Sequence, residues 1–332
     1  MDAPEESMRE TGYVAADLER GPIGALVQRL AATLQSLLPH EIAFGALYAI
    51  VVARLLAAPG GLAWREIAIW VGFACVSLTV AWWSTEHPTT AAWRIRLGVY
   101  VVLMNAAYAR MAPVAAALRS PLRDAMLQRV DRVLFGAPLP LVFDRWVTPA
   151  RTEFLSACYF LLFPYILVSC VRQLWRYRTA PDEARRFFAG VFTVYGVGFV
   201  GYLLVPAAGP YLSMADAFAH PIAGGWITSL NDLVVRRGSN HVDVFPSLHV
   251  AVSAFLLGFD VRHARWRFWA YAVPGFGLWL STLYLRYHYG IDVFSGFVLA
   301  AFGIAVAYST EPRLLRTAPR PELALDTLPR KS

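Results

Sequence analysis

The sequence has little charge. Only 16% of its 332 residues are charged, whereas a soluble globular protein usually carries about a quarter. Hydrophobic residues make up 57% of the chain, and the mean hydropathy is +0.46. So few charged residues could not cover the surface of a water-soluble protein of this length. The composition therefore excludes an ordinary soluble enzyme and favours a polytopic membrane protein.

Cysteine is also scarce, and the start of the chain lacks the features of a secretory leader. The 3 cysteines, Cys75, Cys158 and Cys170, all lie inside apolar stretches, where a thiol usually acts as a small hydrophobe. We therefore expect no disulfide framework. The opening MDAPEESMRE has neither the basic start nor the apolar core of a signal peptide, so we expect residues 1–40 to form a solvated tail and an amphipathic stretch.

The basic residues exceed the acidic ones by seven, with Lys+Arg 30 against Asp+Glu 23. A nucleic-acid-binding protein would gather them on one solvated face. Here they fall in short clusters between apolar runs, so we expect no nucleic-acid partner. Three basic segments are prominent: RQLWRYRTAPDEARR, VRHARWRFW and the C-terminal PRLLRTAPRPELALDTLPRKS. Arginines at the ends of membrane spans favour the cytoplasmic side.

Eight apolar segments approach the roughly 20 residues that a helix needs to cross the hydrocarbon core. The expected fold is therefore all-α, a polytopic membrane helix bundle of about eight spans. The stretch ALVQRLAATLQSLL before them is amphipathic and suits a membrane surface. The eight segments are residues 42–58, 66–83, 97–117, 154–173, 187–206, 247–260, 268–287 and 291–308.

The span count and the basic loops together predict the orientation. With eight spans, the three basic segments and both termini share the cytoplasmic face of an integral membrane protein, which is the inner membrane if the chain is bacterial. The segment 118–153 is too charged to span, and we expect an interfacial helix with a re-entrant turn on the opposite face. The expected division is a 1–40 tail, N-terminal spans over 41–117, a catalytic membrane domain over 118–310 and a basic tail over 311–332.

One cluster of polar residues begins an apolar helix in HVDVFPSLHVAVSAF. Pro246 suits the first turn of a helix, because its missing N–H would be unpaired there. The amides of such a turn attract anions such as phosphate. Ser247 adds a hydroxyl donor, and His249 lies in the same turn.

A second cluster is STLYLRYHYGIDVFSG, where His288 and Asp292 are four residues apart. At that spacing the two side chains share one face of a helix. A carboxylate bound to one imidazole nitrogen leaves the other nitrogen free as a nucleophile or base. In the expected topology, His249 begins a helix leaving the extracytoplasmic face and His288 ends the next helix returning to it.

Other interpretations of these residues stay open at this point. Each histidine could be a helix cap or an interfacial residue. The set of His241, Asp243, His249, His288 and Asp292 could instead hold zinc, although no two histidines lie four apart on one helix. A transporter or membrane scaffold with polar residues along a path is a further possibility. Only a shared catalytic site explains why both clusters meet at one face.

The two clusters resemble the motifs of the type 2 phosphatidic acid phosphatase superfamily. That family carries PSGH and SRxxxxxHxxxD, which appear here as PSLH at Pro246 to His249 and as Ser281-Thr282, five residues, His288, three residues and Asp292. FPSLH, TLYLxxxHYxxD and VPAAGPYL at 205–212 are similar to the inositol phosphorylceramide synthase, or aureobasidin-resistance, branch. The resemblance covers about 125–308 and implies a core like the family's six-helix fold.

The resemblance also implies roles for three residues. In this family the histidine of the last motif attacks phosphorus and forms a phosphohistidine, which here assigns the nucleophile to His288. The histidine of PSGH protonates the leaving group, so His249 is the expected acid. The aspartate orients the nucleophile, so Asp292 takes that role. Such a double displacement splits one difficult transfer into two easier steps.

The chain departs from the family in its phosphate-binding residues. The first family motif, KxxxxxxRP, should fall near the end of the fifth span, where GYLLVPAAGP has neither lysine nor arginine. Thr282 replaces the family arginine, and Leu248 replaces the glycine of PSGH. Transition-state charge must then be stabilised by other groups. The expected phosphate- or substrate-binding residues are Ser247, Tyr211, Arg286, Arg236 and Arg237.

The expected function is that of a membrane lipid phosphotransferase without metal or other cofactor. It would move a phosphoryl group or a phospho-headgroup, for example phosphoinositol, from a lipid donor to an alcohol. With water as acceptor, the same site would be a lipid-phosphate phosphatase. The expected partners are a lipid phosphate or phospholipid and the bilayer, and the sequence leaves the oligomeric state open.

Overall fold

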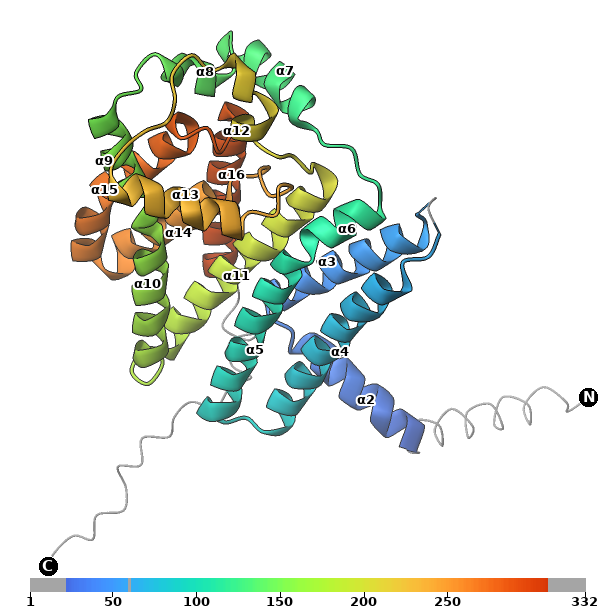
Figure 1. Cartoon of the computed structure of the whole chain (residues 1–332). Coiled ribbons are helices and arrows are strands. Elements are labelled where there is room, and N and C mark those ends of the chain that lie inside the picture. Colours follow the sequence, from blue (N-terminus) through green and yellow to red (C-terminus); the bar gives the residue numbers. More distant parts are fainter. Residues whose placement is uncertain (1–21, 59–60, 310–332) are drawn as a thin grey trace, which may run out of the picture.

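The computed structural model describes residues 22–58 and 61–309 of the chain. All regular elements in that part of the chain are helices, as Figure 1 shows. The expected all-α class is therefore confirmed. The two expected tails, which include residues 1–21 and 310–332, lie outside the described residues.

The N-terminal helices form one side of the bundle. The amphipathic stretch is helical, and Figure 1 shows this helix, α2, below the bundle. Thr89 caps α5 (Thr90–Ala109) by accepting a hydrogen bond from the N–H of Ala92. The elements are α2 (Pro22–Gln35), α3 (Pro39–Leu56), α4 (Trp64–Glu86), α5 (Thr90–Ala109) and α6 (Met111–Ala117).

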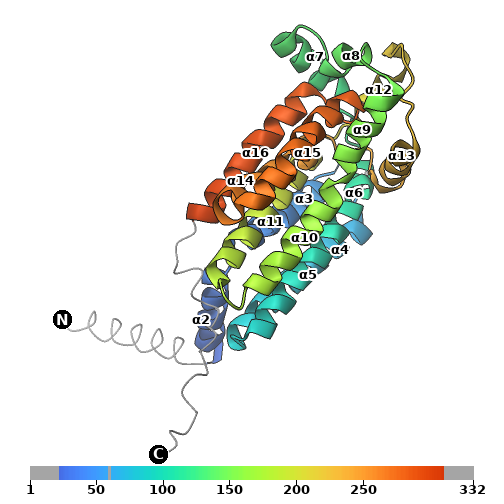
Figure 2. The same ribbon diagram turned by 90° about the vertical axis from the view of Figure 1, so that its left-hand side faces the viewer.

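Short helices cover one end of the bundle, which we call the α7 end (Figure 2). The charged segment 118–153 forms the expected helix, which ends at Gly136 in a left-handed conformation with φ of 80°. The opposite end, where α10 turns into α11, is called the α2 end. The elements of the α7 end are α7 (Asp124–Phe135), α8 (Leu139–Asp144), α12 (Pro210–Ser213), a 3₁₀ turn (Ala215–Ala217) and α13 (Trp226–Gly238).

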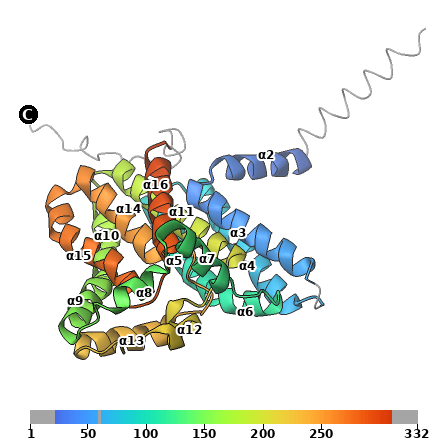
Figure 3. The same cartoon turned by 90° about the horizontal axis from the view of Figure 1, so that it is seen from above.

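Six helices of the described part of the chain build the second half of the bundle, and α11 joins it to the first. Helix α11 is the most buried of the candidate spans and packs against α3 on one side and α14 and α16 on the other (Figure 3). Glycines allow this close approach, because a Cβ at Gly190 would lie 2.4 Å from the Phe255 ring. The six are α9 (Pro149–Phe160), α10 (Leu162–Arg176), α11 (Pro181–Leu204), α14 (Leu248–His263), α15 (Arg265–Tyr284) and α16 (Gly290–Ser309).

The described helices are consistent with a membrane bundle. Five spans are long and apolar enough to cross a bilayer, one of which combines α9 and α10, and a sixth follows if the bent pair α5 and α6 is one span. Helices occupy all eight expected places, but α14 has only 16 residues, fewer than the roughly 20 that a perpendicular span needs. The count of about eight therefore stays a prediction. Many large apolar side chains on the outside, such as Val102, Leu167 and Phe294, suit contact with lipid.

Candidate active site

A cavity of about 330 Å³ lies between α5, α9, α10, α11, α13 and the start of α14. Both histidines of the sequence motifs, His249 and His288, line it. The α10 wall is apolar, and the loop between α13 and α14 contributes Ser239 and Asp243. Six tyrosines also face it: Tyr108, Tyr159, Tyr195, Tyr202, Tyr211 and Tyr287. An apolar cavity with a few convergent polar groups is the usual form of a binding site.

His249 reaches the cavity from the first turn of α14. Ser247 is the N-cap residue, and its hydroxyl accepts the Val250 N–H at 3.4 Å. Ser247 is fully buried, so in this conformation its hydroxyl serves the helix start rather than the cavity. The His249 ring stacks on Tyr159, and its Nε2 lies 2.7 Å from the Tyr159 hydroxyl.

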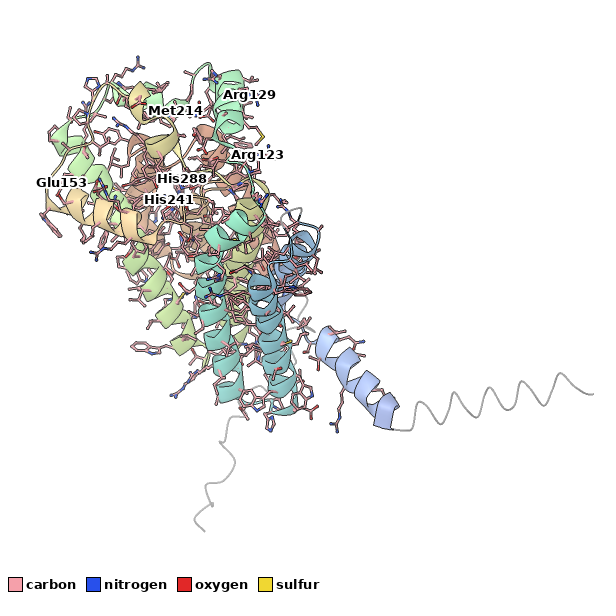
Figure 4. The ribbon with its side chains drawn as sticks, turned by 45° about the vertical axis from the view of Figure 1, so that its right-hand side comes forward. Arg123, Arg129, Glu153, Met214, His241 and His288 are labelled. Atoms are coloured by element: carbon pink, nitrogen blue, oxygen red, sulfur yellow. The ribbon has the colours of Figure 1, made fainter. Side chains whose placement is uncertain are left out.

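His288 lies in the short turn between α15 and α16, and Figure 4 shows it beneath the helices of the α7 end. The turn is closed by the carbonyl of Thr282, which accepts the N–H groups of Tyr287 and His288 at 3.0 Å each. The imidazole is 3% exposed, and its centroid lies 5.8 Å from that of His249. The two histidines that are 39 positions apart in sequence therefore face each other across one site.

Asp292 stands behind His288, in the first turn of α16. Its Oδ2 accepts the Tyr289 N–H at 2.7 Å and lies 3.6 Å from His288 Nδ1. This second distance is slightly too long for a hydrogen bond, and catalytic contacts of this kind often shorten when substrate binds. The Asp292 carbonyl also accepts the Ser247 N–H at 3.1 Å, which joins the two sequence motifs directly.

Burial keeps the nucleophile candidate neutral. Removal from water lowers the pKa of His288 to about 4, although the charge of Asp243 and the Val244 backbone act in the opposite direction. At neutral pH the imidazole therefore carries a free lone pair. Its Nδ1 has no hydrogen-bond partner within the described residues, so the ring is free to form the contact with Asp292.

Two carboxylates of α7, which the sequence reasoning missed, hold the backbone around the site. Asp131 accepts the N–H groups of Gly290 and Ile291, at 2.8 and 2.9 Å, in the first turn of α16. Asp124 accepts those of Ala208 and Gly209, both at 2.9 Å. The two aspartates are seven residues apart and so share a helix face, a signal visible in the sequence, but the sequence does not reveal their partners.

Tyr211 is brought to the cavity by the turn at Gly209. Gly209 has φ of 94°, and a Cβ there would lie 3.0 Å from the Tyr287 carbonyl, so only glycine suits this position. The Tyr211 N–H donates to the Arg286 carbonyl at 2.9 Å, and its hydroxyl lies 3.1 Å from His241 Nδ1. The expected substrate-binding residue Tyr211 therefore lines the same cavity as the histidines.

The expected arginines lie elsewhere in this conformation. The Arg286 guanidinium donates to Asp144 at 2.7 Å and to the His220 carbonyl, and it stacks over Phe218. Burial opposes ionisation of Asp144, but hydrogen bonds and the Arg286 charge lower its pKa below the usual value. Arg236 and Arg237 are exposed at the end of α13, where Arg236 pairs with Asp232. No lysine or arginine is among the described residues that line the cavity.

The zinc alternative finds no support in the described part of the chain. No three histidine, cysteine, aspartate or glutamate side chains come together there in a way that could hold a metal ion. Of the five residues considered, His241 contacts Tyr211, and Asp292 contacts a backbone amide. Asp243, His249 and His288 line the cavity but do not form such a group.

The fold and the site together define a class: a polytopic membrane protein whose buried site combines two facing histidines with an aspartate behind one of them. A family model narrows this class. The model of the PAP2 superfamily matches residues 125–306, more than half of the chain. The chain therefore belongs to the PAP2 superfamily. This membership agrees with the enzyme interpretation of the two histidine motifs rather than with a transporter or scaffold.

One curated relative is more specific. The chain is 31% identical over 132 residues to a phosphoinositol dihydroceramide synthase of Bacteroides thetaiotaomicron. The matched part is 35% of this chain and 43% of the relative, so the chain aligns with less than half of that protein's length. No solved structure matches. These findings support the branch to which the motifs FPSLH and TLYLxxxHYxxD are similar.

Proposed function

We propose that this protein transfers a phospho-headgroup from a lipid donor to an alcohol through a phosphohistidine on His288. The observation that carries the proposal is the position of His288. It is buried beside Asp292 and faces His249 across 5.8 Å between ring centroids. A nucleophile, an acid and an orienting carboxylate are thus within reach of one bound phosphate.

In the first half-reaction, the ring nitrogen of His288 remote from Asp292 attacks phosphorus. The new N–P bond forms as the P–O bond to the lipid breaks, and His249 gives its proton to the departing oxygen. The positive charge that develops on His288 is stabilised by the Asp292 carboxylate, 3.6 Å from Nδ1. The hydroxyl of Tyr159, at 2.7 Å from His249 Nε2, orients the acid.

In the second half-reaction, an alcohol takes the place of the departed lipid. Its oxygen attacks phosphorus as the N–P bond breaks, and its proton passes to His249, which returns to its starting state. Water in the same position would give hydrolysis. The choice between a transferase and a phosphatase thus depends on which hydroxyl reaches the phosphorus.

The charge around the cavity favours a donor with one negative charge. A phosphate monoester carries up to two charges at neutral pH, and enzymes usually hold such groups with arginine or lysine. The described lining has neither, which suits a phosphodiester. The name of the Bacteroides relative, phosphoinositol dihydroceramide synthase, agrees with transfer of phosphoinositol from a phosphodiester lipid.

The walls of the cavity suit entry of a lipid from the bilayer. Asn105 of α5 and Phe163 of α10 both line the cavity and are exposed on the outside. The site therefore reaches the outer surface between two helices of the bundle. The basic clusters support an extracytoplasmic site with both termini in the cytoplasm, and cysteine accessibility at Arg236 in intact cells would test that orientation.

The test compares variants of the purified protein in detergent–lipid micelles. Donor phosphatidylinositol and a fluorescent dihydroceramide acceptor report transfer, and released inositol phosphate reports hydrolysis. His288→Ala should abolish both products, and Asp292→Ala should lower both rates by about 10²- to 10⁴-fold, as expected for loss of an acid–base partner. Exposed Arg129→Ala is the matched control and should retain the rate.

Three results would contradict the proposal. Turnover that survives both His288→Ala and Asp292→Ala would exclude the phosphohistidine route. Inositol phosphate as the sole product, at saturating acceptor, would make the protein a phosphatase. Loss of activity with a chelator and its return with zinc would make the site metal-dependent.

A further inference from the structure

Asp243 is the single residue with a full charge among the described residues that line the cavity. It lies three positions before Pro246, in the loop from α13 to α14, and is partly buried. The phosphohistidine mechanism does not use it. A carboxylate near a phosphate is unfavourable unless it meets another part of the substrate, so this residue requires a separate explanation.

Side chains of the protein occupy some of the hydrogen-bond acceptor positions of the Asp243 carboxylate. The Tyr108 hydroxyl donates a hydrogen bond to Asp243 Oδ2, and the Ser239 hydroxyl donates one to Oδ1 at 2.8 Å. Both donors are hydroxyl groups. An ionised carboxylate has about four acceptor positions, so two remain for a group inside the cavity.

No arginine or lysine among the described residues pairs with Asp243, because the ion pairs of this part of the chain all join other residues. Its charge is not cancelled and attracts donors. It repels phosphate oxygens and favours hydroxyl hydrogens, because a carboxylate can only accept hydrogen bonds. The hydroxyl of Ser239, which donates to Asp243, and that of Tyr211, which lies 3.1 Å from His241 Nδ1, belong to residues that line the same cavity and would extend this hydroxyl-binding surface.

We infer that Asp243 is the specificity-determining residue for a polyol headgroup, accepting hydrogen bonds from hydroxyls of the group that is transferred with the phosphate. This inference rests on the proposed function. Asp243 makes and breaks no covalent bond: the N–P and P–O bonds change at His288, and the proton moves through His249. The carboxylate binds hydroxyls that do not react and thereby selects the headgroup.

The test uses two phosphodiester donors with the same acyl chains. Phosphatidylinositol carries several headgroup hydroxyls, and phosphatidylethanol carries none. With fluorescent dihydroceramide as acceptor, Asp243→Asn should lower kcat/KM for phosphatidylinositol by about 10- to 100-fold, the usual effect of losing hydrogen bonds to a charged group. The value for phosphatidylethanol should fall much less, because this donor loses only the effect of the Asp243 charge on His288. The preference for the polyol donor therefore collapses.

Tyr108→Phe is the matched control. It removes one donor to Asp243 but keeps the carboxylate in the cavity, so the donor preference should remain. If Asp243 only ties α5 to the α13–α14 loop, both variants will lower the rates with both donors equally, and the inference is overturned. An unchanged donor preference in Asp243→Asn, with a higher KM for dihydroceramide alone, would overturn it too and assign the carboxylate to the acceptor.

The experiment separates this inference from the proposed function. His288→Ala tests the chemistry with both donors, whereas Asp243→Asn tests only the difference between them. If His288→Ala stays active, the proposed mechanism fails. If His288→Ala is inactive and Asp243→Asn keeps the wild-type donor preference, the mechanism stands and the polyol inference fails.

Discussion

Buried carboxylates are satisfied differently in two regions of the molecule. At the α2 end, carboxylates are paired with arginine. Around His288, Asp144 pairs with Arg286, but three other carboxylates accept hydrogen bonds from backbone N–H groups. The arginine-paired residues are Glu41 with Arg96, Glu183 with Arg172 and Arg176, and Asp260 with Arg267. The amide-paired residues are Asp124, Asp131 and Asp292.

The arginine-paired and the amide-paired carboxylates differ in whether their negative charge is cancelled. An ion pair cancels charge and joins helices that are distant in sequence, as Arg96 of α5 and Glu41 of α3 do. Amides orient a carboxylate and leave its negative charge in place. In the proposed mechanism a negative charge near His288 is useful, because the imidazole would become positive when it attacks phosphorus. An arginine in the same position would bind Asp292 and weaken its effect on the histidine.

The largest effect on stability is expected from breaking an ion pair at the α2 end. Arg96→Met leaves Glu41 buried without its cation, and unpaired buried charges of this kind cost about 3–5 kcal/mol. The Arg96 side chain also donates to Ser84 and to the Ser36 carbonyl, so three segments lose a contact. We expect a lower unfolding temperature in detergent and an unchanged kcat for the molecules that remain folded.

The double variant Arg96→Met with Glu41→Leu controls this result. Replacing both charges with apolar groups should recover much of the lost stability, because no unpaired charge remains. A double variant as unstable as the single one would mean that the pair acts through packing. A fall in kcat in either variant would show that the α2 end contributes to catalysis. It would contradict the distinction between structural ion pairs at the α2 end and functional carboxylates around His288.

The helices could be predicted from the sequence because each depends on a local pattern. Apolar runs of about 20 residues indicate spans whatever lies beside them, and Pro246 with Ser247 indicates the start of α14. Predicting that His249 and His288 lie close together needed one further step. Counting the spans places both residues on the same side of the membrane. The structure places the centroids of the two rings 5.8 Å apart, whereas the number of spans and their orientation stay predictions.

The surroundings of the site could not be predicted, because they depend on contacts distant in sequence. Asp131 is 159 positions from Gly290, whose N–H it accepts, and no local pattern links them. Arg286 was expected to bind phosphate because it lies two residues before His288. Its backbone has φ of 66°, and the side chain is directed to Asp144 instead. The distance in sequence between two residues of a turn does not predict the directions of their side chains.

A smaller effect is expected from weakening an amide-paired carboxylate. Asp131→Asn keeps one oxygen to accept an N–H, but it loses the charge and places an NH₂ against the Gly290 or Ile291 amide. The first turn of α16 should shift and move Asp292 relative to His288. We expect kcat to fall about tenfold, in line with one charge-assisted hydrogen bond, with little change in KM.

Arg129→Gln is the control for this variant, because Arg129 is an exposed residue of the same helix, α7. It should leave kcat unchanged. A purely structural role for Asp131 would lower the yield of folded protein and its unfolding temperature without lowering kcat per folded molecule. That outcome would mean that the amide-paired Asp131 is structural, as the arginine-paired carboxylates of the α2 end are.

The smallest effect is a shift in the acid limb of the pH profile. His288 must be unprotonated to attack, and burial lowers its pKa to about 4, against a usual value of about 6.5. The acid limb of kcat/KM, which reports protonation of His288, should therefore lie near pH 4 for a phosphodiester donor, which does not titrate in this range. The proton that His249 must carry limits the rate only from the alkaline side of the profile. Asp243 attracts the protonated ring and raises its pKa, so Asp243→Asn should move the limb to still lower pH. An acid limb near pH 6.5 in the wild type would contradict the effect of burial on the pKa of His288. A limb that moves to higher pH in Asp243→Asn would contradict the effect of the Asp243 charge.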